Sequence, residues 1–195
     1  MKVLIAGVVG GLLVFCWSAV SHMALPLGEM GIEQSGGPNE AAILESLKAD
    51  LPASGLYMLP TADPSITDPK LQMEDAMQKW SAGPSAVINY RAEGMSAMGT
   101  QTLGKEAAAN VLAALIAAIV LAASKCGYVG RVLLVALLGV FTWLNVEVSY
   151  WIWYSFPRDY MLAQGADHAA GWLIAGLVMA AIVRPKRGLG MDDMP

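Results

Sequence analysis

The chain has 195 residues, of which 56% are hydrophobic and only 14% are charged, and its mean hydropathy is +0.51. A soluble domain usually carries about 25% charged residues, so this composition excludes an ordinary soluble globular protein. The formal net charge of -4 gives no indication of a nucleic-acid partner, since no basic groove is visible. Cys16 and Cys126 do not form a disulfide framework, because one lies inside the first apolar run and the other follows the second.

Apolar residues are concentrated in four segments that contain one ionisable carboxylate and no Lys or Arg, namely 3–20, 107–124, 132–152 and 169–183. Each is close to the roughly 20 residues that a membrane-spanning helix needs. We therefore predict a mainly α membrane protein, a bundle of four transmembrane helices with a polar tail after them. Their predicted bounds are 1–23, 103–124, 131–154 and 167–183, and the tail is 184–195. The turn between the second and third helices is short, so we expect these two to be antiparallel neighbours.

The first apolar run could also be a signal peptide, with Ala19-x-Ser21 as the cleavage site. It is longer than a usual signal core, so we expect a retained helix. Gly7 and Gly11 share one face of this helix with Ser18 and His22, and small residues at this spacing favour close helix packing. We therefore expect His22 to point into the bundle rather than into lipid.

The polar segment 24–102 predicts a small α+β insert between the first two membrane helices. Apolar residues recur at helical spacing over 40–50, where Asn39 is the expected N-cap. A second helix is predicted over 69–81, because Asp68-Pro69 places a capping residue directly before a proline.

Two short apolar runs in the insert, 56–59 and 86–90, are bounded by turn residues and predict a pair of strands. An insert of about eighty residues is near the size at which a hydrophobic core is marginal. We therefore expect it to dock on the membrane helices.

Cations are distributed unevenly around the four apolar segments. If the helices alternate in direction, one side of the membrane receives Lys2, Lys125, Arg131, Arg184, Lys186 and Arg187, whereas the opposite loop, 153–166, has only Arg158. Cytoplasmic loops are enriched in Lys and Arg, so both termini are predicted to be cytoplasmic and the insert extracytoplasmic. This places the chain in a bacterial inner membrane with a periplasmic insert. An aromatic belt at the outer face would comprise Trp17, Trp151, Trp153, Tyr154, Phe156 and Trp172.

Each predicted membrane helix carries a polar residue at a similar depth. At ~1.5 Å per residue, Asn110, Glu147 and His168 lie about 22–24 Å from the cytoplasmic end, and His22 about 30 Å. Polar side chains in a bilayer usually pair with one another or face water. This polar layer, which also includes Ser18 and Asn145, is therefore the candidate site.

Several interpretations of the polar layer are open. His22, His168 and Glu147 could bind a divalent transition metal, and the two histidines could instead ligate haem. The histidines could also be interfacial groups that are hydrogen-bonded to backbone or to Glu147. Glu147 lies roughly 140–160° from Thr142 and Asn145 around an ideal helix, so both sides cannot face one interior. The methionines outside the membrane suggest copper, but core packing explains them more simply.

The sequence carries no phosphate loop, no Gly-x-Ser-x-Gly and no His-Glu-x-x-His. The insert has no histidine or cysteine, which removes the commonest nucleophile and base pairs from it. We therefore expect a non-catalytic membrane protein, an accessory or assembly subunit whose outer domain contacts a protein partner or a second copy. The alternative is a small-ligand or transition-metal binding or transport protein that uses the polar layer.

Overall fold

The computed structural model describes residues 1–34, 37–96 and 98–184, and the chain forms two compact units. The first unit comprises Met1–Glu33 and Ala97–Pro195, and the second is Gln34–Ser96. The predicted tail, including Lys186 and Arg187, lies almost entirely outside the described residues.

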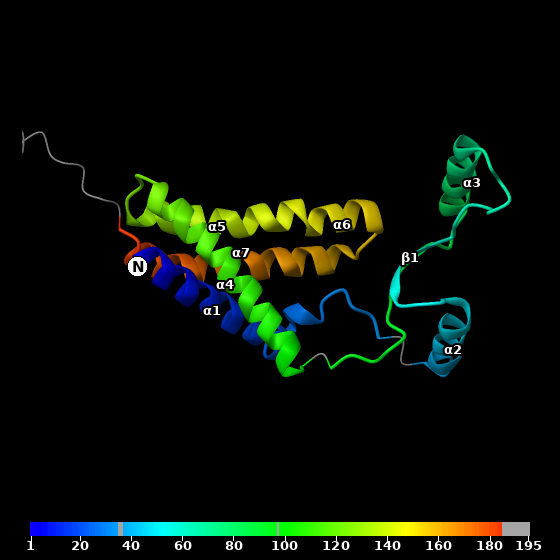
Figure 1. The fold of residues 1–195 in the computed structure, drawn as a ribbon, viewed down its shortest axis with the longest axis horizontal. Coiled ribbons are helices and arrows are strands. Elements are labelled where there is room, and N and C mark those ends of the chain that lie inside the picture. Colours follow the sequence, from blue (N-terminus) through cyan, green and yellow to red (C-terminus); the bar gives the residue numbers. More distant parts are fainter. Residues whose placement is uncertain (35–36, 97, 185–195) are drawn as a thin grey trace, which may run out of the picture. The chain divides into compact units, whose positions relative to one another are not determined.

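The first unit contains the spans that are long and apolar enough to cross a membrane (Figure 1). Within the described residues there are four: α1 (Lys2–Met23), α4 (Thr100–Ala123), the consecutive helices α5 (Tyr128–Asn145) and α6 (Glu147–Tyr154), and α7 (Arg158–Ile182). A short 3₁₀ turn, η1 (Pro26–Gly28), follows α1. The predicted mainly helical architecture with four membrane-spanning segments is therefore confirmed by length and composition.

Helix α7 begins earlier than predicted, at Arg158 rather than at residue 167. Pro157 precedes its first turn, and the carbonyl of Pro157 accepts the N–H of Met161 at 3.1 Å. Asp159 lies in that first turn, where the helix dipole favours a carboxylate. Most of the segment predicted as an outer loop is thus helical, and Asp167 and His168 lie inside α7 rather than at its start.

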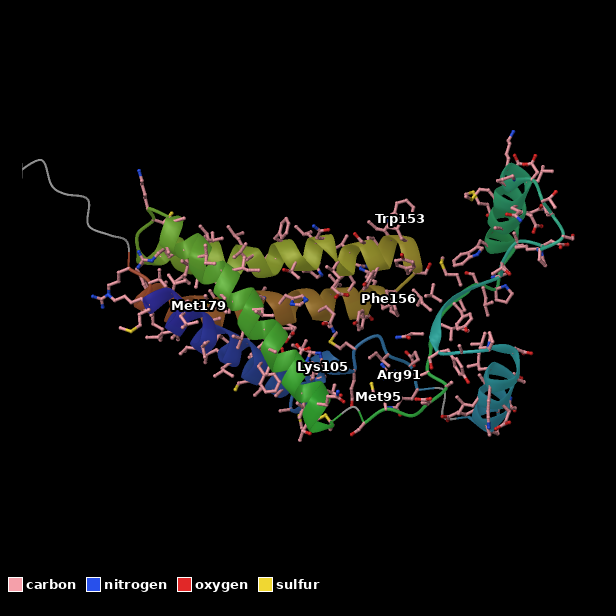
Figure 2. All side chains as sticks on the ribbon, viewed as in Figure 1. Arg91, Met95, Lys105, Trp153, Phe156 and Met179 are labelled. Carbon is pink, nitrogen blue, oxygen red and sulfur yellow. The ribbon has the colours of Figure 1, made fainter. Side chains whose placement is uncertain are left out.

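The third span is interrupted near its end. Helix α5 ends at Asn145, α6 begins at Glu147, and Val146 between them has φ −104° and ψ −66°. After α6 the ring of Phe156 packs against Tyr150 and Tyr160, with centroid distances of 5.3 and 5.5 Å. In Figure 2, Trp153 points away from the other helices of this unit.

Small residues let α1 approach α4 closely. A Cβ atom added to Gly7 would lie 2.8 Å from the Cα of Leu115, and one added to Gly11 would lie 2.8 Å from the carbonyl carbon of Asn110. On α4, the side chains buried in the core are Ala114, Ala117, Ala118 and Leu121. The packing face predicted from the spacing of Gly7 and Gly11 is confirmed.

Helix α5 packs along α7 and contacts α4 only slightly. A Cβ atom on Gly139 would lie 2.6 Å from the backbone oxygen of His168, so the two helices are close at this point. The indole N–H of Trp143 also donates to the backbone oxygen of Met161 at 2.8 Å. The short turn after α4 therefore does not make α4 the main neighbour of α5. Instead, α5 packs closely on α7 at Gly139.

The second unit has two helices and a two-stranded sheet. Its elements are α2 (Glu40–Asp50), β1 (Gly55–Leu59), α3 (Pro69–Ala82) and β2 (Ala86–Tyr90). The strands are antiparallel, with Gly55 opposite Tyr90 and Leu59 opposite Ala86. The predicted helices and the predicted strand pair are all present.

The two expected helix caps of this unit differ. The side chain of Asp68 accepts the N–H groups of Lys70 at 2.8 Å and Leu71 at 3.3 Å, as a capping residue should. Asn39 occupies the N-cap position of α2 but makes no side-chain capping bond. The second unit has no buried core, since none of the residues 37–96 is buried.

Candidate functional site

Two adjoining hollows lie among the helices of the first unit, with volumes of about 380 and 250 Å³. They share four lining residues, Ser18, Glu106, Asp167 and His168, and we call them together the polar cavity. The larger hollow is also lined by His22 and Gln164, and the smaller one by Asn110 and Thr142. The polar cavity is thus formed mainly by α1, α4 and α7, with one contribution from α5.

Helical spacing places these side chains on common faces. On α7, Gln164, Asp167, His168 and Gly171 follow the i, i+3, i+4, i+7 pattern of a single face. On α1, Ser18 and His22 are one turn apart. On α4, the amide of Asn110 donates to Glu106 Oε1 at 3.0 Å across one turn, which orients both side chains.

Asp167 is the most deeply buried polar side chain of the polar cavity. It is 5% exposed, and its Oδ1 atom accepts no hydrogen bond from the residues that the structure describes. Its backbone oxygen, by contrast, accepts the indole N–H of Trp17 at 3.1 Å, which ties α1 to α7 beside the cavity. A buried carboxylate oxygen without a donor is costly, so a partner from outside the described chain is expected at this atom.

The two histidines both line the larger hollow. The Nδ1 atom of His22 lies 3.0 Å from the backbone oxygen of Ser18 and 3.0 Å from the hydroxyl of Ser21. Because a carbonyl oxygen only accepts, the first bond requires a proton on Nδ1, and in the neutral ring Nε2 is then an acceptor. His168 is half-buried on α7, next to Asp167.

Glu147 lines neither of the two hollows that form the polar cavity. It is half-buried at the start of α6, within electrostatic range of His168 and Tyr160, and its buried Oε2 atom has no hydrogen-bond partner among the residues that the structure describes. Asn145 is exposed and also lies outside the polar cavity, where its backbone oxygen accepts the hydroxyl of Ser149 at 2.9 Å. Of the predicted layer, Ser18, His22, Asn110 and His168 line the polar cavity, whereas Glu147 and Asn145 do not.

Within the described residues, no three His, Cys, Asp or Glu side chains form a group that could hold a metal ion. The predicted ligands His22, His168 and Glu147 are thus not gathered into one set in this structure. Transition-metal binding by these residues stays a prediction.

The sequence prediction does not include Asp167, Gln164 or Glu106 among the members of the site. The predicted bounds place Asp167 at the start of the last helix, where a carboxylate is an ordinary cap. The signal that could have found it is the spacing Gln164-x-x-Asp167-His168-x-x-Gly171, which is a polar helical face in an otherwise apolar segment.

No protein-family model matches the chain, and no curated protein or solved structure is significantly similar to it. The four long apolar spans are the pattern of a multi-pass membrane protein. What the protein does must therefore be argued from its own residues.

Proposed function

We propose that this is a non-catalytic protein of the bacterial inner membrane, an accessory or assembly subunit whose residues 24–102 are extracytoplasmic and contact a partner protein. The observation that carries the proposal is the second unit, which folds into helices and a sheet without burying a single described residue. A unit of this kind gains stability when a partner covers its apolar surface.

The apolar surface of the second unit is extensive. Side chains that are between 42% and 66% exposed occur on both helices and on β1, namely Ile43, Leu44, Leu56, Met58, Leu71, Met73 and Met77. Burial of apolar surface is worth about 25 cal/mol per Å², and exposed apolar patches commonly mark interaction sites. These residues are therefore the proposed contact surface.

The proposed orientation is supported by charge and by aromatic residues in the first unit. Lys2 begins α1, Lys125 lies in the turn between α4 and α5, and Arg184 follows α7. Trp151 and Trp153 belong to α6, at the other end of the third span, and are 42% and 74% exposed, as expected for side chains that anchor in lipid headgroups. Both termini are accordingly proposed to be cytoplasmic.

Orientation is tested by accessibility of single cysteines in intact spheroplasts. With Ser65→Cys, an impermeant maleimide should label residue 65, whereas Cys126, in the proposed cytoplasmic turn, should react only after lysis. Labelling of Cys126 in intact spheroplasts would overturn the orientation.

Partner contact is tested with an impermeant amine-reactive crosslinker in spheroplasts, followed by mass spectrometry. Lys48 and Lys70, on α2 and α3, should form crosslinks to a second protein or a second copy. Met77→Asp should reduce the crosslinked fraction severalfold, because Met77 is 64% exposed in the proposed contact surface. Gln78→Asp adds the same charge at a neighbouring exposed polar position and should leave the crosslinked fraction unchanged. If the wild-type protein forms crosslinks only within a single molecule, and none to a second protein or a second copy, the proposed contact is wrong.

A second candidate function, the binding or transport of a small ligand, is favoured by the polar cavity and by Oδ1 of Asp167, which has no hydrogen-bond partner within the described part of the chain. The chemistry of that ligand is argued next.

A further inference from the structure

The lining of the polar cavity has an excess of negative charge. It contains the carboxylates of Glu106 and Asp167, and no Lys or Arg is among its lining residues. The remaining polar groups are histidines, hydroxyls and amides. A cation is therefore the electrostatic complement of this cavity.

The polar atoms require a cation that donates hydrogen bonds. Asp167 Oδ1 is buried and has no donor among the described residues. In the neutral ring of His22, Nε2 is an acceptor, because the contact of Nδ1 with the carbonyl of Ser18 requires the proton on Nδ1. Glu106 receives a bond on Oε1 from Asn110. These acceptors come from three helices and do not form a set of three metal ligands, so they suit a group with several N–H bonds.

The rest of the wall is apolar. Phe15, Met23, Met98 and Leu103 also line the larger hollow. Its volume of about 380 Å³ falls within the roughly 300–1,000 Å³ of small-molecule sites. The cavity therefore has room for an apolar body attached to the cationic group.

We propose that the polar cavity binds a primary ammonium group carried on an apolar body. The ammonium donates to the carboxylate of Asp167 and to neighbouring acceptors on α1 and α4, and the apolar body lies against Phe15, Met23 and Leu103. The same chemistry is offered by a free aliphatic amine and by the headgroup of an aminophospholipid. This inference gives the ligand-binding function a chemical class and is independent of the partner contact of the second unit.

In this proposal the side chain of Asp167 makes the main contribution to binding. A hydrogen bond to the backbone oxygen of Asp167 positions this residue. The bond from Trp17 to the carbonyl of Asp167 fixes the position of α7 relative to α1 at this level. Because a hydrogen bond to a charged group is worth roughly 1.5–3 kcal/mol, its loss should weaken affinity by at least about tenfold.

The test uses the purified full chain and n-hexylammonium as the probe, titrated by isothermal calorimetry. The wild-type protein should bind it saturably. Asp167→Asn should weaken binding at least about tenfold, and Glu106→Gln should weaken it less, because Glu106 is exposed and already shares a bond with Asn110. Asp159→Asn is the matched control, since this exposed residue is on the same helix but outside the polar cavity.

Two further probes separate charge from hydrogen bonding. Hexyltrimethylammonium keeps the charge without an N–H donor, and 1-hexanol keeps the apolar body without the charge. Both should bind at least about tenfold more weakly than n-hexylammonium. Equal binding of either probe would overturn the proposal, as would unchanged binding by Asp167→Asn. If Asp167→Asn does not fold, the probe series on the wild-type chain and on Glu106→Gln still decides.

The source of the ammonium is resolved in nanodiscs. Phosphatidylethanolamine should weaken n-hexylammonium binding relative to phosphatidylcholine alone if the headgroup occupies the cavity. Equal binding in both lipids assigns the site to a free amine. Either result keeps the ammonium site, whereas absence of saturable binding in both lipids and in detergent overturns it. The result of the crosslinking test on the second unit does not depend on any of these binding results, so the two proposals can fail separately.

Discussion

The indole N–H of Trp17, on α1, donates a 3.1 Å hydrogen bond to the backbone oxygen of Asp167, on α7. That oxygen lies inside a helix, where the N–H four residues later, that of Gly171, is its ordinary donor. Gly171 leaves the space that the indole needs, because a Cβ atom there would lie 2.8 Å from Cδ1 of Trp17. The contact between α1 and α7 beside the polar cavity therefore depends on one tryptophan and one glycine together.

Replacement of Gly171 by alanine should displace Trp17 and weaken the bond to Asp167. The cost of such overpacking is about 1–3 kcal/mol, partly offset by the better helix propensity of alanine. Gly104→Ala is the control, since nothing lies within 4 Å of a Cβ atom at Gly104 in α4. Thermal unfolding in detergent should show a lower Tm for Gly171→Ala and an equal or higher Tm for Gly104→Ala. Equal Tm values in the two variants would contradict this account.

Arg131 links the turn after α4 to the end of α7. Its guanidinium donates to the backbone oxygens of Cys126 at 2.9 Å and Ala180 at 2.8 Å, and the side chain is 4% exposed. Arg131→Lys keeps the positive charge at this end of the membrane but removes the planar fork that reaches both oxygens.

This substitution should lower the free energy of unfolding by about 1–2 kcal/mol. Arg184→Lys is the control, because Arg184 is exposed and its bond among the described residues is a long one, 3.4 Å, to the carbonyl of Ala181 in its own helix. Denaturation in mixed micelles compares the two. Equal effects would show that Arg131 acts through charge alone.

The number of spans and the closest helix contacts were predictable because their signals are local. Hydropathy over one segment is sufficient to identify a span, and glycine or alanine spacing is sufficient to identify a face that packs closely. The pairing of α5 with α7 was not predictable from the short turn after α4, because it depends on how Gly139 fits against the backbone of His168.

The candidate site was only partly predictable. Ser18, His22, Asn110 and His168 were predicted in one layer from the constant rise per residue, and all four line the polar cavity. Asp167 was missed because the early start of α7 at Arg158 depends on a short polar turn that hydropathy does not detect. The direction of Glu147 was not predictable, because wheel arithmetic assumes an unbroken helix, whereas the third span is interrupted at Val146.

Asp68 and Asn39 provide a matched pair of helix N-caps in the second unit. Asp68 accepts two backbone N–H groups at the start of α3, whereas Asn39 makes no side-chain capping bond at the start of α2. Asp68→Ala should therefore destabilise α3 by about 1 kcal/mol, and Asn39→Ala should have little effect. Hydrogen exchange of residues 69–82 and 40–50, followed by mass spectrometry, measures each helix separately. Equal protection losses would mean that the capping bonds do not decide the stability of these helices.

The second unit should lose structure in acid because of Asp63 and Asp75. Bonds from the hydroxyl and N–H of Ser65 hold the pKa of Asp63 below its ordinary value of 3.8. The bond from Lys79, at 2.7 Å, and the N–H of Asp63 lower the pKa of Asp75 in the same way. Each carboxylate binds protons less readily in the folded state than in the unfolded state. Its contribution is therefore complete above the unfolded pKa and is lost as the pH falls through the folded pKa.

Amide exchange of residues 55–82, corrected for the intrinsic pH dependence of exchange, should accordingly accelerate below about pH 4. Asp75→Asn should reduce protection already at neutral pH and flatten the acid response, because it removes the group that titrates. Glu74→Gln is the control on the same helix, since Glu74 makes only an exposed ion pair with Lys70 at 3.9 Å. An acid response that is unchanged in Asp75→Asn and in Asp63→Asn would show that these two carboxylates do not link the fold of the second unit to pH.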